Sequence, residues 1–350
     1  MNPAEAEVLL RVEHGLGRIT LNRPRAINAL THAMVRTIQT ALTTWETDER
    51  VRAVVLDGAG ERGLCAGGDI RSIYHDARTG GTTSLAFWAD EYRLNAHIAR
   101  YPKPYVALMD GLVMGGGVGL SAHGSLRVVT ERSSVGMPEV GIGFVPDVGG
   151  TYLLSRAPGQ LGVHAALTAA QLSGPDAIHC GLADHYVPST RLTDLLRALE
   201  TTTPADAVAS VAETPPESTL AARSAWIDSC YAADTVEEIL DRLHAHGSES
   251  SAAGKEIEAK SPTALKVTLR ALRSAAGLPT LEAALDQEYR VASGCLRAPD
   301  LIEGVRAQII DKDRNPRWSP STLAEVGPEL VDRFFTIPDN GDLGLAGGQQ

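Results

Sequence analysis

Two glycine-rich segments are the first candidates for chemistry in this sequence, because each follows a run that predicts a buried strand. The first is 64–70 (LCAGGDI), after the apolar run 51–56, and the second is 114–119 (MGGGVG), after 105–109. Glycine has no side chain, so a ligand can approach its backbone closely. Backbone N–H groups at two such strand ends could face one developing negative charge and form an oxyanion hole.

The second segment allows other interpretations. Residues 117–122 (GVGLSA) match the dinucleotide-binding pattern GxGxxA, and Glu139 lies 22 positions after Gly117, where that pattern expects an acid. However, the pattern normally follows the first strand of its domain, whereas a strand–helix–strand unit precedes it here. Residues 119–124 (GLSAHG) are one residue too long for the serine elbow GxSxG. Tight helix packing without chemistry also stays open.

Two acids lie in glycine-containing loops further along the chain: Glu139 in 137–143 (MPEVGIG) and Asp147 in 144–150 (FVPDVGG). Two carboxylates near one substrate push their pKa values apart, which gives them different protonation states. In simpler interpretations, Glu139 caps a turn and Asp147 is the N-cap of a helix near Tyr152. Together with the two glycine segments, the acids favour a catalytic pair.

The elements that must position these residues predict an α/β fold. Short strands are expected at 8–12 and 18–21, and buried strands at 51–56, 105–109 and 126–130. Helical spacing covers 31–45, with Thr31 as the expected N-cap, and 85–100. From about Ser189 the sequence changes from a mixed strand and helix pattern to a mostly helical one. A Pro/Thr-rich connector at 201–218 leads to predicted helices at 235–244, 262–275, 280–292 and 301–310.

Composition limits the class of partner. The chain has 350 residues and a formal net charge of −11, so it lacks the basic surface that draws proteins onto nucleic acid. Its four cysteines form no CxxC pair, which suits a reducing compartment and predicts no metal site. The start MNPAEAEVLL has acids where a signal peptide needs basic residues, and 104–122 is a poor membrane span. We therefore expect a soluble cytoplasmic protein with no membrane partner.

Three motifs together carry a family resemblance: CAGGDI (65–70), MGGGVGL (114–120) and MPEVGIG (137–143). They resemble the crotonase (enoyl-CoA hydratase/isomerase) superfamily, over about 8–310. The resemblance implies a crotonase-like ββα spiral with a helical C-terminal region. It also implies that the N–H groups of Gly68 and Gly116 form the oxyanion hole, and that Ala66, Gly67 and Asp69 bend around CoA.

One difference from the hydratases of this superfamily indicates a more specific subfamily. Hydratases of this superfamily carry two glutamates. The later one matches Glu139, but the earlier position is Gly119 here, and Asp147 is an additional acid. The segments 104–124, 137–150 and 303–318 (EGVRAQIIDKDRNPRW) are similar to the 3-hydroxyisobutyryl-CoA hydrolase subfamily. That likeness implies substrate contacts at Glu91, Gly116, Glu139 and Asp147, where Glu91 depends on the segment EYRLN aligning without gaps.

The resemblance implies hydrolysis of a short β-hydroxyacyl-CoA to the free acid and CoA, a step of valine breakdown. Glu139 would act as general base on water or attack directly to form an anhydride. No cofactor is expected, because CoA is part of the substrate. A trimer or hexamer is expected from the superfamily. The alternatives are an enoyl-CoA hydratase/isomerase and a non-catalytic acyl-CoA-binding protein.

The change of character along the chain predicts three regions. These are a spiral core at 1–200, a mainly helical region at 201–335 and a flexible tail at 336–350.

Overall fold

The computed structural model describes residues 6–348, and these form two compact units that interleave along the chain. The first unit runs to Gly68 and adds Arg93–Gly136 and Leu172–Thr219. The second contains Asp69–Tyr92, Met137–Gln171 and the chain from Leu220 onward. The predicted boundaries at 200 and 335 divide the chain into consecutive regions, whereas each of these units combines segments from different parts of the chain. That domain division stays a prediction.

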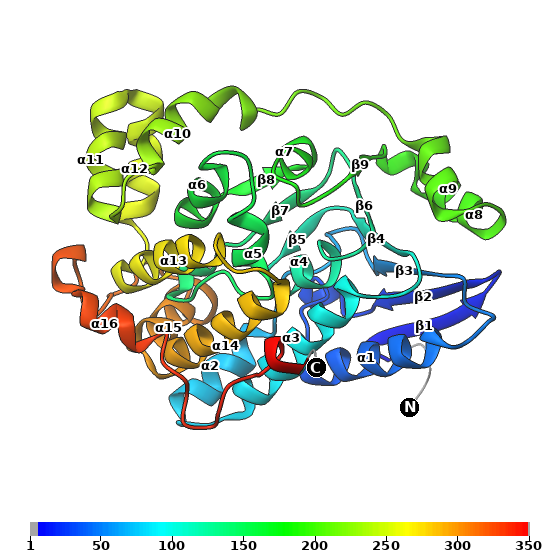
Figure 1. Ribbon diagram of the computed structural model, residues 1–350, viewed down its shortest axis with the longest axis horizontal. Coiled ribbons are helices and arrows are strands. Elements are labelled where there is room, and N and C mark those ends of the chain that lie inside the picture. The colour runs from blue at the N-terminus through cyan, green and yellow to red at the C-terminus, as the bar shows by residue number, and fades with distance from the viewer. Residues whose placement is uncertain (1–5, 349–350) are drawn as a thin grey trace. The chain divides into compact units, whose positions relative to one another are not determined.

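The first unit is built on a six-stranded sheet in the order β1-β2-β3-β4-β6-β9 (Figure 1). Its strands are β1 (Val8–Glu13), β2 (Leu16–Leu21), β3 (Ala53–Gly58), β4 (Tyr105–Met109), β6 (Leu126–Val129) and β9 (His185–Tyr186). The β1–β2 hairpin is antiparallel, with Val8 opposite Leu21, and every later pairing is parallel. The hairpin turns at His14 and Gly15, which both have positive φ, as a tight right-twisted hairpin requires.

A second, three-stranded sheet consists of β5 (Leu112–Met114), β7 (Ser134–Gly136) and β8 (Gln171–Ser173), in that order. The chain alternates between the sheets: β4 leads to β5, β6 leads to β7, and β8 leads to β9. Such alternation winds the chain into a spiral of strand pairs, in which the segments between β4 and β5 and between β6 and β7 are short.

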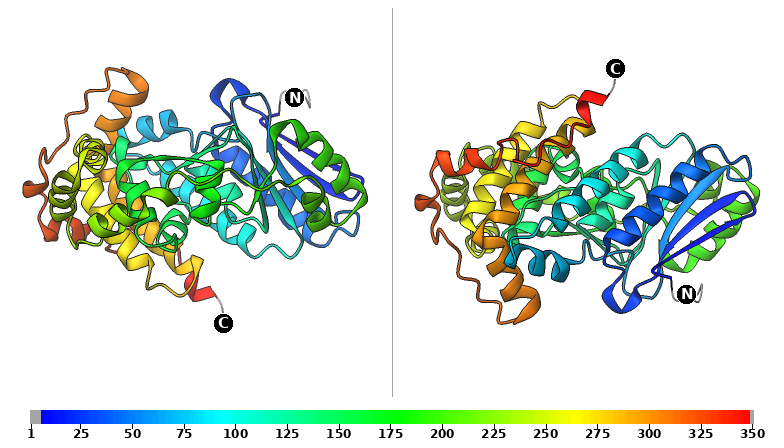
Figure 2. Two further views of the ribbon diagram at one scale, coloured as in Figure 1. Left: turned by 90° about the horizontal axis from the view of Figure 1, so that it is seen from above. Right: turned by 90° about the horizontal axis from the view of Figure 1, so that it is seen from below.

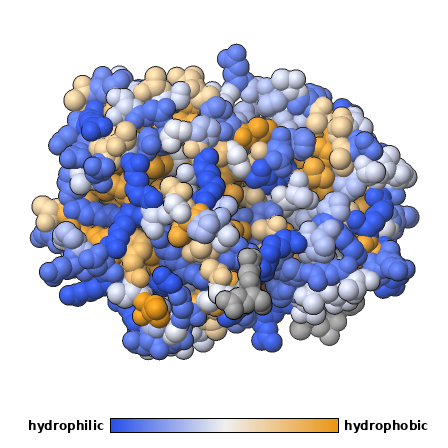
Figure 3. Space-filling model, in the orientation of Figure 1, coloured by the Kyte–Doolittle hydropathy of each residue, from blue (hydrophilic) through white to orange (hydrophobic). Residues whose placement is uncertain are grey.

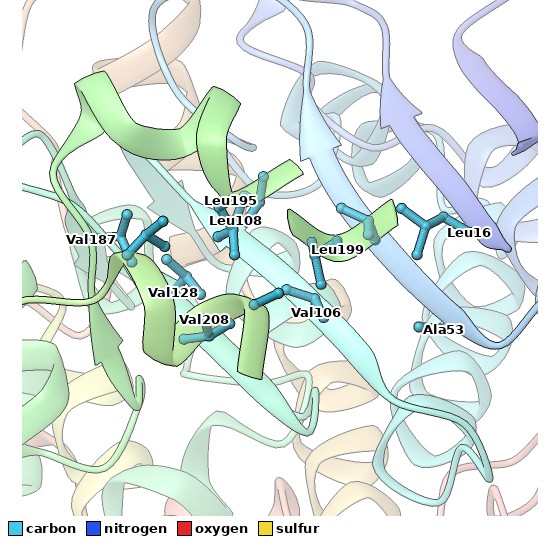
Figure 4. Close-up of a cluster of buried hydrophobic side chains, with 12 residues drawn as sticks. Leu16, Ala53, Val106, Leu108, Val128, Val187, Leu195, Leu199 and Val208 are labelled. Carbon is cyan, nitrogen blue, oxygen red and sulfur yellow. The ribbon is translucent and has the colours of Figure 1, made fainter. Parts of the chain in front are cut away.

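Helices cover both faces of the six-stranded sheet. In both views of Figure 2, α1 (His32–Glu46) lies on one face and α8 (Leu192–Thr201) and α9 (Pro204–Val211) on the other. The predicted N-cap is confirmed, since the Thr31 hydroxyl accepts a hydrogen bond from the Met34 amide at 3.2 Å. Figure 4 shows α8 and α9 packing Leu195, Leu199 and Val208 onto the strand residues Val106 and Val128. The other helical segments here are η2 (Pro24–Ala26), α4 (Gly116–Ser121), α7 (Gly174–His179) and η4 (Ser189–Arg191).

The connector expected at 201–218 is partly helical, which corrects that expectation. Thr203 caps α9 by accepting the Asp206 amide at 3.2 Å, and Pro204 occupies the first turn, where it needs no N–H partner. The apolar spacing of Ala207, Val208 and Val211 then buries one face of the helix. Proline and threonine therefore mark the start of this helix.

The second unit is mostly helical, as the later part of the sequence predicts. Helices α11 (Val236–His246) and α12 (Ser248–Glu258) lie side by side in Figures 1 and 2, and α13 (Pro262–Ala275) packs on α14 (Leu281–Arg297). Helix α3 (Thr83–Ala99) begins in this unit and ends in the first. The remaining elements are α2 (Ile70–Arg78), η3 (Glu139–Ile142), α5 (Gly150–Leu154), α6 (Leu161–Thr168), η5 (Ala221–Arg223), α10 (Ser224–Tyr231), α15 (Pro299–Val305), the π-helix η6 (Arg306–Ile310), η7 (Leu323–Glu325), α16 (Pro328–Arg333) and η8 (Ala346–Gly348).

The predicted tail makes several contacts with α14. Arg290 pairs with Asp342, and the Asp286 carboxylate accepts the amides of Leu345 and Ala346 at 2.8 and 2.9 Å. Residues 349–350 of that tail lie outside the described residues.

The face drawn in Figure 3 is mostly hydrophilic, and its hydrophobic residues appear in small separate groups. Across residues 6–348, no helix is both long enough and apolar enough to cross a membrane.

Candidate active site

The two glycine segments lie against each other within the first unit. The amide of Met114 donates to the carbonyl of Cys65 at 2.9 Å, and Cys65 bridges Val113 in parallel fashion. Gly67 has φ +100°, and a Cβ built on it would lie 3.3 Å from the Met114 oxygen and 3.8 Å from the Gly116 nitrogen. The structure therefore brings together the backbone of 66–68 and 115–116, as the sequence predicts.

Gly116 begins the short helix α4, directly after β5. The first N–H groups of a helix have no partner within the helix, and the helix dipole favours negative charge there. A Cβ on Gly117 would lie 2.7 Å from the Cys65 carbonyl oxygen, so a side chain would push the two segments apart. Asp69, near the end of the first segment, occupies the N-cap position of α2 and belongs to the second unit.

The competing interpretations of 114–124 do not fit this geometry. The segment follows β5 of the small sheet and not the first strand of a dinucleotide-binding unit. Ser121 lies inside α4, and its hydroxyl donates to the Gly117 carbonyl at 2.6 Å, so it is no exposed nucleophile. Gly119 is buried in the same helix.

The acids gather in the second unit. Glu91 comes from α3, Glu139 starts η3, Asp147 lies in the turn before α5, and Glu288 comes from α14. Their exposed fractions are 2%, 7%, 5% and 1%. Buried carboxylates on this scale are rare unless they are paired or functional. We refer to these four residues as the acid cluster.

The carboxyl oxygens of the acid cluster differ in whether they accept a hydrogen bond. The Tyr92 hydroxyl donates to Oδ2 of Asp147 at 2.7 Å. Within residues 6–348, Oε2 of Glu139 and Oε1 of Glu91 are buried without a hydrogen-bond partner. An unpartnered buried carboxyl oxygen costs stability, and functional sites are where proteins keep such groups.

Burial and mutual repulsion shift the pKa values of the cluster upward. Burial, and then the charge of Asp147, raise the pKa of Glu139 well above its usual range. The same two causes raise the pKa of Glu91. Burial raises the pKa of Asp147, although the Tyr92 hydroxyl opposes that rise. Since Asp147 alone of these three has a hydroxyl donor, it is the acid best able to hold a negative charge near neutral pH.

Close backbone packing fixes the segment that carries Glu139. Gly143 has φ +71°, and a Cβ there would lie 2.3 Å from the Asp300 carbonyl oxygen on α15. A Cβ on Gly304 would lie 2.4 Å from the carbonyl carbon of Ile142. Helix α15 is held in turn by Asp300, which accepts from the Ser261 hydroxyl and the Ser319 amide. Glu139 is thus presented by a tightly packed turn.

The simpler roles for the two predicted acids are excluded. Helix α5 has Gly149 as its N-cap, without a side-chain cap, so Asp147 does not cap it. Glu139 is the first residue of η3, and its buried Oε2 has no hydrogen-bond partner among the described residues, whereas a capping oxygen would accept one. The predicted residues therefore form two groups: Ala66, Gly67, Gly68 and Gly116 in the first unit, and Glu91, Glu139 and Asp147, with Asp69, in the second.

Two residues at this site, Tyr92 and the acid-cluster member Glu288, were not predicted from the sequence. Tyr92 is fully buried beside Glu91, and Glu288 lies on the core side of α14 among Leu285, Val291 and Cys295. The helical spacing of these apolar residues is visible in the sequence. A single glutamate on that apolar stripe was the signal that could have identified Glu288.

Removing the Tyr92 hydroxyl should weaken catalysis without removing an acid. In Tyr92→Phe, Asp147 loses its hydroxyl donor, and its pKa rises further because that hydrogen bond favours the charged form. A hydrogen bond to a charged group contributes ~1.5–3 kcal/mol, so we expect kcat to fall about tenfold. Tyr289→Phe is the control, because the Tyr289 hydroxyl meets Asn340 and not Asp147. Equal kcat values for the two variants would contradict this role.

The part of the chain that the structure describes contains no group of three or more His, Cys, Asp or Glu side chains placed to hold a metal ion. All four cysteines are buried, and none of them forms a disulfide.

Comparison with known proteins supports the resemblance stated from the motifs. Residues 16–335 match the family model described as enoyl-CoA hydratase/isomerase. The protein named 3-hydroxyisobutyryl-CoA hydrolase, mitochondrial, from Danio rerio is 43% identical over 354 aligned positions. That alignment covers 98% of this chain and 92% of the relative.

Two solved structures share the fold over nearly the whole chain. One, described as a carnitinyl-CoA dehydratase from Mycobacterium thermoresistibile, is 55% identical with a TM-score of 0.94, covering 96% of this chain and 98% of that one. Another, described as an enoyl-CoA hydratase from Rhodobacter sphaeroides 2.4.1, is 43% identical with a TM-score of 0.91, covering 97% and 99%. The predicted crotonase-like α/β spiral with a helical C-terminal region is confirmed.

The predicted cytoplasmic location is wrong. The relative from Danio rerio is named as a mitochondrial protein, which contradicts that prediction. Cysteine usage distinguishes oxidising from reducing compartments but does not distinguish one reducing compartment from another.

The motifs, the alternation of the chain between two sheets and the match over residues 16–335 agree. The chain belongs to the enoyl-CoA hydratase/isomerase family.

Proposed function

We propose that the protein hydrolyses the thioester of 3-hydroxyisobutyryl-CoA, or of a similar short β-hydroxyacyl-CoA, to the free acid and CoA. The observation that carries this proposal is the buried pair Glu139 and Asp147 in a chain that has Gly119 where related hydratases have a glutamate. The name of the 43%-identical relative supports the same reaction.

In the proposed mechanism, the glycine segments stabilise the negative charge that develops on the thioester oxygen. When an oxygen nucleophile attacks the thioester carbon, the carbonyl oxygen gains a negative charge. The amides of Gly68 and Gly116 stabilise that oxygen, each contributing on the order of 3 kcal/mol to the transition state. The backbone of Ala66, Gly67 and Asp69 holds the CoA part of the substrate.

Glu139 supplies the oxygen, by one of two routes. As a general base it takes a proton from water while the water oxygen bonds to the acyl carbon. As a nucleophile it bonds to that carbon itself, and water then hydrolyses the anhydride. In both routes the carbon–sulfur bond breaks, CoA leaves as a thiolate that takes up a proton, and the acid is released.

Asp147 and Glu91 complete the proposed site. Asp147, held by Tyr92, orients the attacking water or accepts a hydrogen bond from the 3-hydroxyl of the substrate. Glu91 contacts the substrate from α3, with a buried oxygen that has no partner in the described chain. The differing environments of the acids support this division of roles.

The wider context is part of the proposal. The reaction needs no cofactor beyond the CoA of the substrate, and it serves as a step of valine breakdown. The expected assembly is a trimer or a hexamer, and the expected partner is the acyl-CoA alone.

Thiol release across a panel of acyl-CoA esters tests the proposal. We expect CoA release from 3-hydroxyisobutyryl-CoA and, more weakly, from 3-hydroxypropionyl-CoA, because one methyl group changes binding by only ~1–3 kcal/mol. Acetyl-CoA, which lacks the 3-hydroxyl, should be a poor substrate. A protein that binds these esters but releases no thiol would be an acyl-CoA-binding protein, and the proposal would fail.

A second candidate is the reversible addition of water to an enoyl-CoA. The descriptions of the two similar solved structures, a dehydratase and a hydratase, favour it. Gly119 argues against it, because one glutamate is missing from the usual pair. Loss of enoyl absorbance with crotonyl-CoA, without thiol release, would select this second candidate.

A further inference from the structure

Glu288 is the acid that the proposed mechanism does not use. Its side chain is 1% exposed on the core side of α14, yet both carboxyl oxygens have partners. Oε2 accepts the Gly149 amide at 2.6 Å, and Oε1 accepts the Thr151 amide at 2.8 Å. The Thr151 hydroxyl also donates to Oε1. All three donors belong to the segment that directly follows Asp147.

That segment has a backbone that needs support. Val148 has φ +52° and Gly149 has φ +81°, so two consecutive residues are left-handed. Such a conformation is costly for a β-branched residue and persists only where the surroundings impose it. The turn closes through the Gly150 amide, which donates to the Asp147 carbonyl at 2.6 Å. Glu288 accepts two further amides of the turn, those of Gly149 and Thr151.

We propose that Glu288 is a positioning residue, which fixes the turn 147–151 and thereby sets the direction of the Asp147 carboxylate. This inference rests on the proposed function, because it assigns a purpose to the orientation of Asp147. Tyr92 holds the Asp147 side chain, and Glu288 holds the backbone of Gly149 and Thr151, two and four residues further along the same turn.

Loss of this support should affect the chemical step more than substrate binding. Without Glu288, Val148 is free to relax toward negative φ, and the Asp147 carboxylate moves with it. A displacement of about 1 Å in a catalytic group can cost roughly 100-fold in rate. Binding of the CoA part, assigned to 66–69, does not depend on this turn.

The chain provides a matched control on the same helix. Asp286 is also buried on α14 and also accepts two backbone amides, from Leu345 and Ala346. Its partners belong to the C-terminal tail. Glu288→Gln and Asp286→Asn each replace a carboxyl group by an amide and remove one good acceptor, so they should lower Tm similarly while differing in kcat.

The test is a double-mutant cycle on thiol release from 3-hydroxyisobutyryl-CoA. In the otherwise unchanged enzyme, we expect Glu288→Gln to lower kcat roughly 10- to 100-fold with KM changed less than about twofold. In an Asp147→Asn background the same substitution should cost less than about threefold, because it acts through Asp147. Asp286→Asn should leave kcat unchanged in either background.

Several outcomes would overturn the inference. An unchanged kcat in Glu288→Gln, or the same fold-loss with and without the Asp147 carboxylate, would show that Glu288 does not act through Asp147. If Asp286→Asn lowers kcat as much as Glu288→Gln does, the effect comes from the lower stability of α14 and not from the position of Asp147. If the unsubstituted protein releases no thiol from any ester, the proposed function fails, and the inference fails with it.

Thr151 keeps the inference testable if Glu288→Gln does not fold. Thr151→Val removes only the hydroxyl donor to Glu288, and Thr151→Ser keeps it. We expect Thr151→Val to lower kcat by about three- to tenfold and Thr151→Ser to restore it. Equal kcat values for the two variants would contradict the positioning role.

Discussion

Replacing Glu139 by glutamine is expected to lower kcat for thiol release by about 1,000-fold. A general base contributes roughly 10²–10⁴-fold, and a nucleophile whose attack is lost costs at least as much. Glutamine keeps the shape of the side chain, so KM should change little. Steady-state kinetics with 3-hydroxyisobutyryl-CoA measures both quantities. A kcat near that of the unsubstituted enzyme would remove Glu139 from the mechanism.

The same variant should be no less stable, which separates lost chemistry from lost folding. Glu139 has a raised pKa in the folded protein, so the fold binds its proton more tightly than the unfolded chain does. Its contribution to stability is fully present below the unfolded pKa of ~4.3 and is lost as pH rises through the folded value. Glu139→Gln removes this loss, so its Tm should exceed that of the unsubstituted protein more at pH 8 than at pH 5.

Replacing Asp147 by asparagine is expected to lower kcat about 100-fold and to move the pH dependence. The charge of Asp147 raises the pKa of Glu139, so neutralising Asp147 lowers that pKa. If Glu139 must be ionised to act, the rise of kcat/KM with pH should therefore shift toward lower pH. The fall in kcat follows from losing the acid that orients water or the 3-hydroxyl.

A buried aspartate elsewhere serves as the control for Asp147→Asn. Asp176 is 6% exposed, in a capping box with Ser173 at the start of α7 in the first unit. Asp176→Asn should lower Tm through loss of the cap and leave the pH profile unchanged. A pH profile that is unchanged in Asp147→Asn would refute the electrostatic link between Asp147 and Glu139.

Local patterns predicted five strands of the larger sheet, β1, β2, β3, β4 and β6, and the helices α1, α3, α11, α13 and α14, but not the short strands β5, β7, β8 and β9. The run 51–56 overlaps β3, and the Thr31 cap precedes α1, because both signals depend on residues adjacent in sequence. The glycine segments were also predictable as neighbours. Each follows a strand and leads into a helix, and a Cβ on Gly117 would lie 2.7 Å from the Cys65 carbonyl oxygen.

The acid cluster was only partly predictable, because it is assembled over long sequence distances. Glu139 and Asp147 could be predicted because each lies in a glycine-containing segment that is recognisable in the sequence. Glu288 and Tyr92 belong to helices, where a buried polar residue looks like a member of the polar face unless the apolar stripe is traced position by position. Their roles depend on contacts with the turn 147–151, which no local pattern encodes.

The site also explains why the second unit tolerates unfavourable features. Four buried acids and a left-handed valine are each costly for stability. Neighbouring elements impose them: α15 packs on the Glu139 turn, and α14 holds the Asp147 turn. These features lower stability but serve the proposed activity. We therefore expect Glu139→Gln to raise Tm while it lowers activity.

Reaction in ¹⁸O-labelled water over many turnovers, followed by mass spectrometry of the products, tests thioester hydrolysis most directly. With 3-hydroxyisobutyryl-CoA we expect one ¹⁸O atom in the carboxylate of the free acid and an equal amount of unlabelled CoA thiol. Incorporation of ¹⁸O at the hydroxyl-bearing carbon of an intact CoA ester, without thiol release, would contradict the proposed reaction and identify water addition instead.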